Sequence, residues 1–245
     1  MRKSKVVLTV VVAVLGMAGA SWAQGDVSVE ATADFFSKYV WRGQNITDDW
    51  SFQPGVSATY EGFTAGVWGS LDLTDENGES GEFIEFDWYG DYSGQINEMI
   101  GYSVGAIYYV FPGAGETTEL YAGLSFDTIA SPSVTVYYDI DEVEGAYVAF
   151  GVGHSFGEEE LGDLPFGVDL SANLGLGDSN YNEAYWGVDS AELNDLTVSA
   201  AFPFEVGPVA VTPSVSFMTL LGGDVSDAAA DDSLFYAGVG FAYGF

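Results

Sequence analysis

Apolar and polar residues alternate along segment after segment of this chain. In Val27–Gly43 the odd positions are nearly all apolar, and the even positions are mostly polar or charged. Successive side chains of a strand point to opposite faces, so each such segment predicts a strand with one apolar and one polar face. Helical periodicity is essentially absent beyond residue 23. The sequence therefore predicts an all-β protein.

The alternating segments give about twelve strands, with ten or fourteen as alternative counts. Pro54 and Pro213 fall inside predicted strands, where each is expected to mark a bulge or an early strand end. Gly177–Asp195 is the longest interruption, and within it Ala184–Val188 is interpreted as an outward extension of a strand. The strand count depends on these places.

The connections between the predicted strands are of two lengths. Glu61-Gly62 and Gly207-Pro208 form tight turns, whereas Thr74–Gly81 and Asp224–Asp232 form longer acidic loops. Short turns at one end and long loops at the other are typical of bacterial outer-membrane barrels. No apolar run beyond residue 23 approaches the length of a transmembrane helix, so a membrane-embedded chain must close as a barrel. We predict a closed antiparallel transmembrane β-barrel over residues 24–245, with both termini in the periplasm.

Residues 1–23 have the features of a secretory signal peptide. Arg2, Lys3 and Lys5 precede the short apolar run Val6–Leu15, and Ser21-Trp22-Ala23 supplies small residues for cleavage before Gln24. The apolar run is short for an uncleaved membrane anchor. A lipoprotein is excluded because the chain has no Cys. The predicted location is the bacterial outer membrane, reached by secretion across the inner membrane.

Charge narrows the range of partners. The chain has 37 acidic and 5 basic residues, and of the basic ones only Lys38 and Arg42 lie beyond the signal peptide. Nucleic acid is therefore excluded as a partner, because its phosphates require basic contacts. The expected partners are outer-membrane lipid, lipopolysaccharide screened by divalent cations, and small solutes or ions.

The polar faces of the predicted strands carry most of the candidate functional residues. Asp and Glu lining a channel favour cations, whereas the same residues in a plugged barrel would be ordinary polar-face residues. Inward-facing Tyr89, Tyr109, Tyr121 and Tyr137 could fill much of a barrel of this size. The candidate lumen-lining residues are Glu30, Asp34, Lys38, Arg42, Asp72, Glu85, Asp87, Asp91, Glu119, Asp127, Asp139 and Asp169.

Lys38 and Arg42 are four residues apart, on one face of the first predicted strand and near its outer mouth. They are expected to act as the local counter-charge, for example to Glu85 and Asp87. Two cations cannot neutralise so many carboxylates, so the sequence predicts a net negative lumen.

Enzymatic chemistry has little support in the sequence. The one histidine, His154, is followed by Ser155 at the end of a strand on the predicted periplasmic side, whereas chemistry on outer-leaflet lipid would need it at the other end. The loop Asp75–Glu79 is rich in oxygen ligands but lacks the spacing of a calcium loop. We therefore predict no catalytic residue, no metal site and no cofactor.

The last predicted strand ends on Phe245, with aromatic residues at alternating positions before it. This pattern resembles the C-terminal signature of outer-membrane proteins, which the barrel assembly machinery favours. A soluble secreted β-sandwich would share the alternation but would not need the terminal aromatic.

Three segments carry a resemblance to a known family. They are SKYVWRG at Ser37–Gly43, FTAGVWGS at Phe63–Ser70 and EFDWYGDY at Glu85–Tyr92. Together they resemble the TorF-type porins, a family of outer-membrane barrel proteins. The resemblance implies a barrel, an outer-membrane location and a channel-like role, and it implies no site residue.

The predicted function is a porin-like channel for small hydrophilic solutes with a preference for cations. A non-conducting structural or adhesive barrel is the alternative, followed by an outer-membrane lipid-modifying enzyme.

The predicted orientation can be tested on intact cells. A protease added from outside is expected to cleave within Thr74–Gly81 or Asp224–Asp232 and to spare Glu61-Gly62, because only the long loops face the medium. Mass spectrometry of the fragments identifies the cleavage sites. Cleavage at Glu61-Gly62 in unbroken cells would reverse the orientation.

Overall fold

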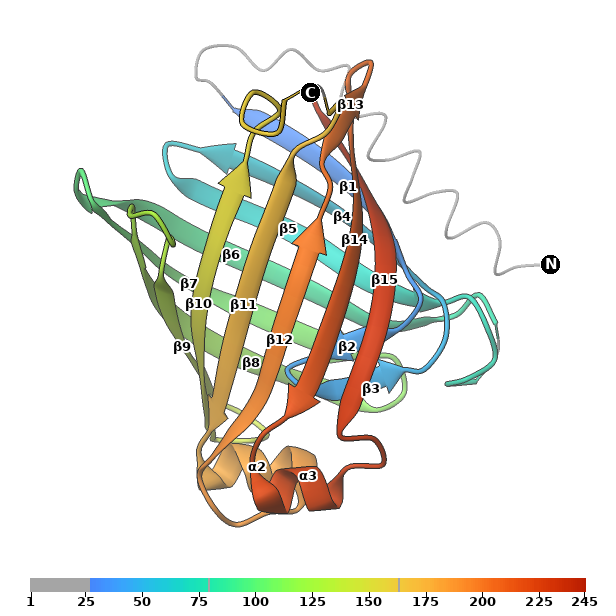
Figure 1. Ribbon diagram of the computed structural model, residues 1–245. Coiled ribbons are helices and arrows are strands. Elements are labelled where there is room, and N and C mark those ends of the chain that lie inside the picture. Colours follow the sequence, from blue (N-terminus) through green and yellow to red (C-terminus); the bar gives the residue numbers. More distant parts are fainter. Residues whose placement is uncertain (1–26, 79, 163) are drawn as a thin grey trace.

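The computed structural model describes residues 27–78, 80–162 and 164–245, so the predicted signal peptide lies outside the described residues. Twelve strands form a closed antiparallel barrel, as predicted, in which each strand pairs with its neighbours in sequence (Figure 1). Pairing of the first strand with the last, and of β12 with β14, closes the sheet. The strands are β1 (Ser28–Phe36), β4 (Ser51–Tyr60), β5 (Phe63–Asp72), β6 (Phe83–Asn97), β7 (Ile100–Phe111), β8 (Gly115–Phe126), β9 (Ser133–Asp139), β10 (Ala146–Phe156), β11 (Val168–Gly177), β12 (Glu192–Ala201), β14 (Val209–Leu220) and β15 (Ser233–Gly244).

A short strand, β13 (Phe204–Val206), continues β12 after a break at Phe202 and Pro203. Ala201 pairs with Ser214 and Phe204 pairs with Val211, so both strands keep one register against β14. Pro203 has no N–H to donate, which explains the break without a shift in register. We count β12 and β13 as one strand of the barrel wall.

The barrel has two distinct ends. β1 begins and β15 finishes at the upper end in Figure 1, which we call the termini end. Two helices, α2 (Ser179–Trp186) and α3 (Gly223–Ala228), lie at the opposite end, which we call the helix end. Within the described residues, no helix is both long enough and apolar enough to cross a membrane.

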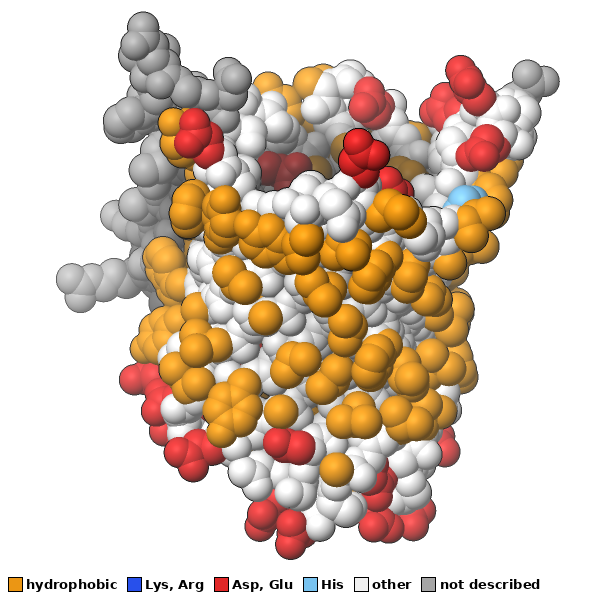
Figure 2. Space-filling model, turned by 90° about the vertical axis from the view of Figure 1, so that its left-hand side faces the viewer, with side chains coloured by type: hydrophobic (Ala, Val, Ile, Leu, Met, Phe, Trp, Pro, Cys, Tyr) orange, Lys and Arg blue, Asp and Glu red, His pale blue; other side chains and the backbone are white. Residues whose placement is uncertain are grey.

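The alternation of the sequence sets the two faces of the wall. Phe35 lies against Phe52 and Phe241 on the outer face, with ring centroids 4.8 and 6.4 Å away. Trp88 and Leu124 are 59% and 39% exposed on the same outer face. Figure 2 shows apolar side chains covering the middle of the barrel, with acidic side chains above and below. This distribution is that of a lipid-facing band between two polar rims.

The expectation for the two prolines is wrong. β4 pairs with β5 at Phe52–Leu71 and again at Gly55–Trp68 in the same register, so Pro54 leaves two positions unpaired without creating a bulge. Pro213 pairs with Val239 inside β14, also in register. A closed ladder tolerates one missing donor when the neighbouring hydrogen bonds hold the register.

The interpretation of Ala184–Val188 as strand is also wrong, because Ala184–Trp186 belongs to α2. The Asp178 carboxylate caps this helix by accepting from Tyr181 N at 2.8 Å, and Gly187 ends it at φ 70°. Side-chain capping at the start and a left-handed Gly at the end are standard helix boundaries. The sequence carried both signals, but the helix is too short for its periodicity to stand out.

The first strand ends sooner than Val27–Gly43 predicts. β1 stops at Phe36, and the chain then forms a separate hairpin of β2 (Tyr39–Trp41) and β3 (Gln44–Thr47). Ser37 fixes the departure point, because its N–H donates to Ala237 O at 2.8 Å and its hydroxyl accepts from Ala237 N at 3.0 Å. Lys38 and Arg42 therefore do not share one face of a strand in the wall.

The two faces can be tested with one pair of neighbouring variants. Val104 is 46% exposed on the outer face, and Ser103 lines the interior. Val104→Arg is expected to lower the free energy of unfolding in liposomes by about 2–4 kcal/mol, because it places a charge in lipid. Ser103→Arg is expected to lower it by much less. Urea titration of both variants measures the difference. Equal losses of stability would contradict the assignment of Val104 to the lipid face and Ser103 to the lumen.

Candidate functional site

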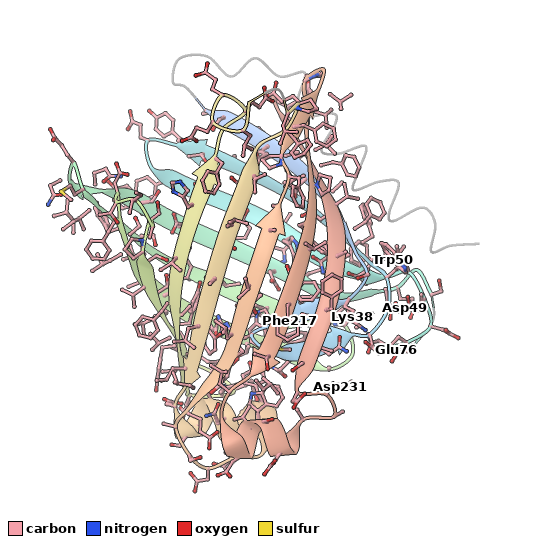
Figure 3. All side chains as sticks on the ribbon, in the orientation of Figure 1. Lys38, Asp49, Trp50, Glu76, Phe217 and Asp231 are labelled. Atoms are coloured by element: carbon pink, nitrogen blue, oxygen red, sulfur yellow. The ribbon has the colours of Figure 1, made fainter. Side chains whose placement is uncertain are left out.

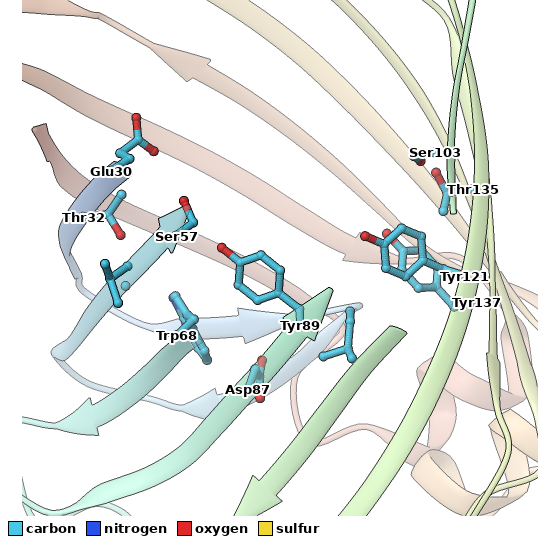
Figure 4. A pocket seen from close by; sticks show the side chains of 13 residues that line it. Glu30, Thr32, Ser57, Trp68, Asp87, Tyr89, Ser103, Tyr121, Thr135 and Tyr137 are labelled. Atoms are coloured by element: carbon cyan, nitrogen blue, oxygen red, sulfur yellow. The ribbon is translucent and has the colours of Figure 1, made fainter. Parts of the chain in front are cut away.

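The interior of the barrel contains a cavity toward the termini end. It has a volume of about 420 Å³, and polar side chains of β1, β4, β6, β8 and β9 line it, among them Glu30, Ser57, Tyr89, Tyr121 and Tyr137 (Figure 4). Figure 2 shows the molecule hollowed at its upper end, with acidic side chains within the opening. This part of the lumen is open and polar.

At the helix end the β2–β3 hairpin folds into the barrel. Its turn consists of Arg42 at φ 46° and Gly43 at φ 84°, between the paired residues Trp41 and Gln44. Two consecutive residues of positive φ make the type I′ turn that suits a two-residue hairpin loop. Tyr39 and Thr47 are buried, so the hairpin is packed against the wall on several sides.

Arg42 is held by a bidentate salt bridge. Its Nη1 and Nη2 donate to the two carboxylate oxygens of Glu119 at 2.7 and 2.8 Å. Only 10% of the Arg42 side chain and 3% of the Glu119 side chain are exposed. Two parallel hydrogen bonds to one carboxylate form the strongest arrangement available to a guanidinium. This pair fixes the tip of the hairpin to β8.

Aromatic rings enclose the same guanidinium. Its central carbon lies 4.3 Å from the ring centre of Tyr137, 4.7 Å from that of Tyr147 and 4.5 Å from that of Trp41. A cation over an aromatic face is attracted by the ring quadrupole, and more strongly where water is excluded. We call Glu119, Tyr137, Tyr147 and Tyr109 the Arg42 cage; Tyr109 belongs to it because its hydroxyl donates to Glu119 at 2.8 Å.

The rest of the hairpin packs through aromatic contacts. The Tyr39 ring lies 5.6 Å from that of Trp68, and Tyr39 Oη donates to Glu85 at 2.9 Å. Trp41 contacts Tyr109 of the wall and Tyr185 of α2, with centroids 6.2 and 5.4 Å apart. The hairpin therefore joins the wall to α2 and narrows the lumen at this end.

Loops at the helix end hold the base of the hairpin. Lys38 pairs with Asp48 within the hairpin loop, and Figure 3 places Lys38 toward the same end as Glu76. Asn77 Nδ2 donates to Ile46 O and Thr47 Oγ1 at 3.1 and 2.9 Å. The loop Thr74–Gly81 thus holds β3 in place, and its Asn77 side chain is engaged in this contact.

The predicted lumen residues fall into three groups. Glu30, Asp34, Asp91 and Asp169 occupy inward positions of the wall, and Asp87 lies between the open cavity and the hairpin. Glu85, Glu119 and Arg42 meet at the hairpin, where Arg42 pairs with Glu119 and not with Glu85 or Asp87. Lys38, Asp72, Asp127 and Asp139 lie at strand ends or in loops.

The acids at the strand ends organise turns. Asp72 accepts from Thr74 N and Asn77 N, both at 3.0 Å. Asp139 accepts from Thr117 Oγ1 at 2.6 Å and from two backbone N–H groups of the next turn. A carboxylate that receives several N–H groups acts as a local cap.

Arg42 and Asp48, both outside the spanning strands, have shifted pKa values. Burial disfavours the charged form of Arg42, but the hydrogen bonds and charge of Glu119 outweigh burial and raise the Arg42 pKa above its ordinary value. The hydrogen bond from Lys38 lowers the pKa of Asp48 below its usual range. Arg42 and Asp48 are therefore charged at neutral pH.

Sequence reasoning placed Tyr109 and Tyr137 inside the barrel, where the structure has them. It missed Tyr147, whose hydroxyl donates to Asp195 at 2.7 Å. It placed Trp41 on the apolar outer face, whereas Trp41 packs inside the barrel against Tyr109. Tyr147 alternates with outward Val148 in β10, so the alternation along this strand could have predicted its inward direction. The inward turn of Trp41 could not have been predicted in this way, because alternation continues through the hairpin.

No group of three or more potential metal-ligating His, Cys, Asp or Glu residues occurs among residues 27–78, 80–162 and 164–245. His154 faces outward near the termini end, with Nδ1 2.8 Å from Ile129 O and its ring against Phe156. Ser155 points the other way, toward the lumen, because its neighbour in the strand faces out. The two side chains do not form a nucleophile–base pair.

The Arg42–Glu119 pair can be tested by limited trypsin digestion. In Lys38→Gln, Arg42 is the only tryptic site beyond the signal peptide. Adding Glu119→Gln is expected to expose Arg42 to cleavage, because removing one partner of a buried pair costs about 3–5 kcal/mol. Lys38→Gln alone is the control, since the Lys38–Asp48 pair is partly exposed and is worth about 0–1 kcal/mol. Protection of Arg42 in both proteins would show that the salt bridge does not hold the hairpin.

Comparison with known proteins supports the fold. A structure described as KdgM porin in complex with disordered oligogalacturonate superposes with a TM-score of 0.54 at 10% identity, over 89% of this chain and 99% of that one. The NanC porin gives 0.53 at 12% identity, over 88% and 98%. At such identities the likeness concerns the fold alone.

No curated protein matches the sequence. The resemblance of Ser37–Gly43, Phe63–Ser70 and Glu85–Tyr92 to the TorF-type porins stays a prediction. A family model described as "Bacterial protein of unknown function (Gcw_chp)" matches residues 20–218, which is most of the chain, and the protein therefore belongs to this family.

Proposed function

We propose that the protein is an outer-membrane channel for small hydrophilic solutes, with a preference for cations. The observation that carries this proposal is the polar cavity of about 420 Å³ that opens at the termini end and narrows at the β2–β3 hairpin. A packed structural barrel would fill this space with side chains, as small barrels do.

The charge of the lumen supports cation preference. Glu30, Asp34, Asp91 and Asp169 face inward along the open part of the wall, and Arg42 is already paired with Glu119. Carboxylates along a passage with low-dielectric walls raise the local cation concentration and repel anions.

The outer face supports the membrane location. Large apolar side chains such as Trp88, Phe150, Leu170 and Phe235 are 45–64% exposed around the barrel, which is costly in water and favourable in lipid. We include outer-membrane lipid, lipopolysaccharide and the barrel assembly machinery at Phe245 as partners in this proposal. No enzymatic activity is part of it.

A non-conducting barrel is the second candidate. It is favoured by the burial of Arg42 and Glu119, which closes part of the lumen at the helix end. In that case the outer loops would carry the function, as an adhesive or structural surface.

Reversal potential in a salt gradient separates these candidates. The wild-type protein in a planar bilayer is expected to show the sign of a cation-selective channel. Lys38→Gln combined with Arg42→Gln is expected to raise both the cation preference and the conductance, because it removes the two basic residues and loosens the hairpin.

Asp224→Asn is a matched control, since Asp224 belongs to α3 at the outer rim and not to the wall. It is expected to leave the sign of the selectivity unchanged. An anion-selective wild type, or a double variant that conducts with unchanged selectivity, would contradict the assignment of the lumen. A folded wild type and a folded double variant that both fail to conduct would favour the second candidate.

A further inference from the structure

The Arg42 cage has the composition of a receptor for a guanidinium group. We infer that it is a binding site for small solutes that carry a guanidinium, and that Arg42 occupies it as a built-in ligand when no solute is bound. This inference rests on the proposed channel function, since it names the class of solute that the channel takes.

The cage belongs to the barrel wall and not to the hairpin. Glu119 lies on β8, Tyr109 on β7, Tyr137 on β9 and Tyr147 on β10. Tyr109 Oη donates to Glu119 at 2.8 Å, and Tyr147 Oη donates to Asp195 of β12 at 2.7 Å. These contacts do not involve Arg42, so they still hold Glu119, Tyr109 and Tyr147 if Arg42 leaves.

The geometry selects a planar cation. Both oxygens of Glu119 accept from Arg42, which matches the fork of a guanidinium and not the single point charge of an ammonium. Tyr137 and Tyr147 present faces 4.3 and 4.7 Å from the guanidinium carbon, the distance at which a delocalised planar cation stacks. A neutral planar molecule would gain the stacking and lose the charge pairing.

Arg42 is presented on a short element that can leave the wall. β2 and β3 contain three and four residues, and Arg42 sits at the first central position of their turn with φ 46°. Asn, Asp and Gly are preferred there because they tolerate positive φ, whereas a long side chain brings no benefit to the turn itself. Arg at this position therefore serves its contact with the cage.

A solute can approach the cage from the open cavity. Tyr137 contacts Arg42 and also lines the cavity, where Figure 4 shows it beside Tyr121. Glu30 and Asp91 face the interior along this approach and attract cations. A guanidinium solute entering here would exchange with Arg42 on Glu119 and free the hairpin tip.

The test uses Arg42→Asn, which removes the guanidinium and keeps the Asn-Gly sequence that suits the turn. The purified variant is folded in detergent micelles, and its thermal unfolding midpoint is measured with millimolar guanidinium chloride. Sodium chloride at equal concentration controls for ionic strength, and urea controls for a neutral molecule of the same shape. Guanidinium is expected to raise the midpoint, and the two controls are not.

Two further variants locate the effect. In Arg42→Asn combined with Glu119→Gln the guanidinium-specific shift is expected to disappear, because the paired carboxylate is gone. In Lys38→Asn, which changes the other basic residue of the same loop, Arg42 competes with guanidinium for the cage, so a smaller shift than in Arg42→Asn is expected. If Arg42→Asn fails to fold, Arg42→Lys replaces it, since lysine keeps the charge and leaves one Glu119 oxygen available for competition by guanidinium.

An equal response of Arg42→Asn to guanidinium and sodium, or a shift that persists with Glu119→Gln, would overturn the inference. The thermal measurement does not depend on conduction. Bilayer recordings of Arg42→Asn then test the link to transport, since guanidinium is expected to reduce the sodium current of a conducting variant. A thermal shift in a protein that never conducts would keep the binding site and reject the proposed channel.

Discussion

The salt bridge between Arg42 and Glu119 is the interaction on which the helix end of the barrel depends. Two charges buried in a low-dielectric interior lose a large hydration energy, which is recovered only with good geometry and a full set of hydrogen bonds. Here both carboxylate oxygens accept from the guanidinium, and Tyr109 adds a third hydrogen bond. The pair draws the β2–β3 hairpin inward, and the hairpin narrows the lumen at the helix end.

Several acids in the interior are paired with tyrosines and not with basic side chains. Glu85, Asp91 and Asp195 each accept a hydrogen bond from a tyrosine, namely Tyr39, Tyr121 and Tyr147. A phenol hydroxyl stabilises a carboxylate as a donor and brings no charge of its own. Tyrosine therefore takes the place of lysine and arginine as the partner of these three acids.

Alternation in the sequence was sufficient for the wall, because a strand between lipid and a polar lumen must change environment at every residue. The faces of Trp88, Leu124 and Ser103 follow from it directly. It failed at Ser37, since the odd residues Tyr39 and Trp41 keep the alternation although they pack inside the barrel against Trp68 and Tyr109. A period of two records that two sides differ and does not record which side is lipid. The pairing of Arg42 with Glu119, residues far apart in sequence, had no local signal at all.

Glycines explain why the inward tyrosines do not fill the lumen. Tyr121 of β8 reaches across Gly105 of β7 to Asp91 of β6, and a Cβ at Gly105 would collide with its ring. Tyr147 of β10 likewise crosses Gly175 of β11 to Asp195 of β12. Because these glycines have no side chain, the tyrosine rings lie flat along the wall. Each hydroxyl then reaches a carboxylate two strands away, and the ring does not extend into the centre of the barrel. Tyr121 lines the cavity of about 420 Å³, and the β2–β3 hairpin narrows the lumen at the helix end.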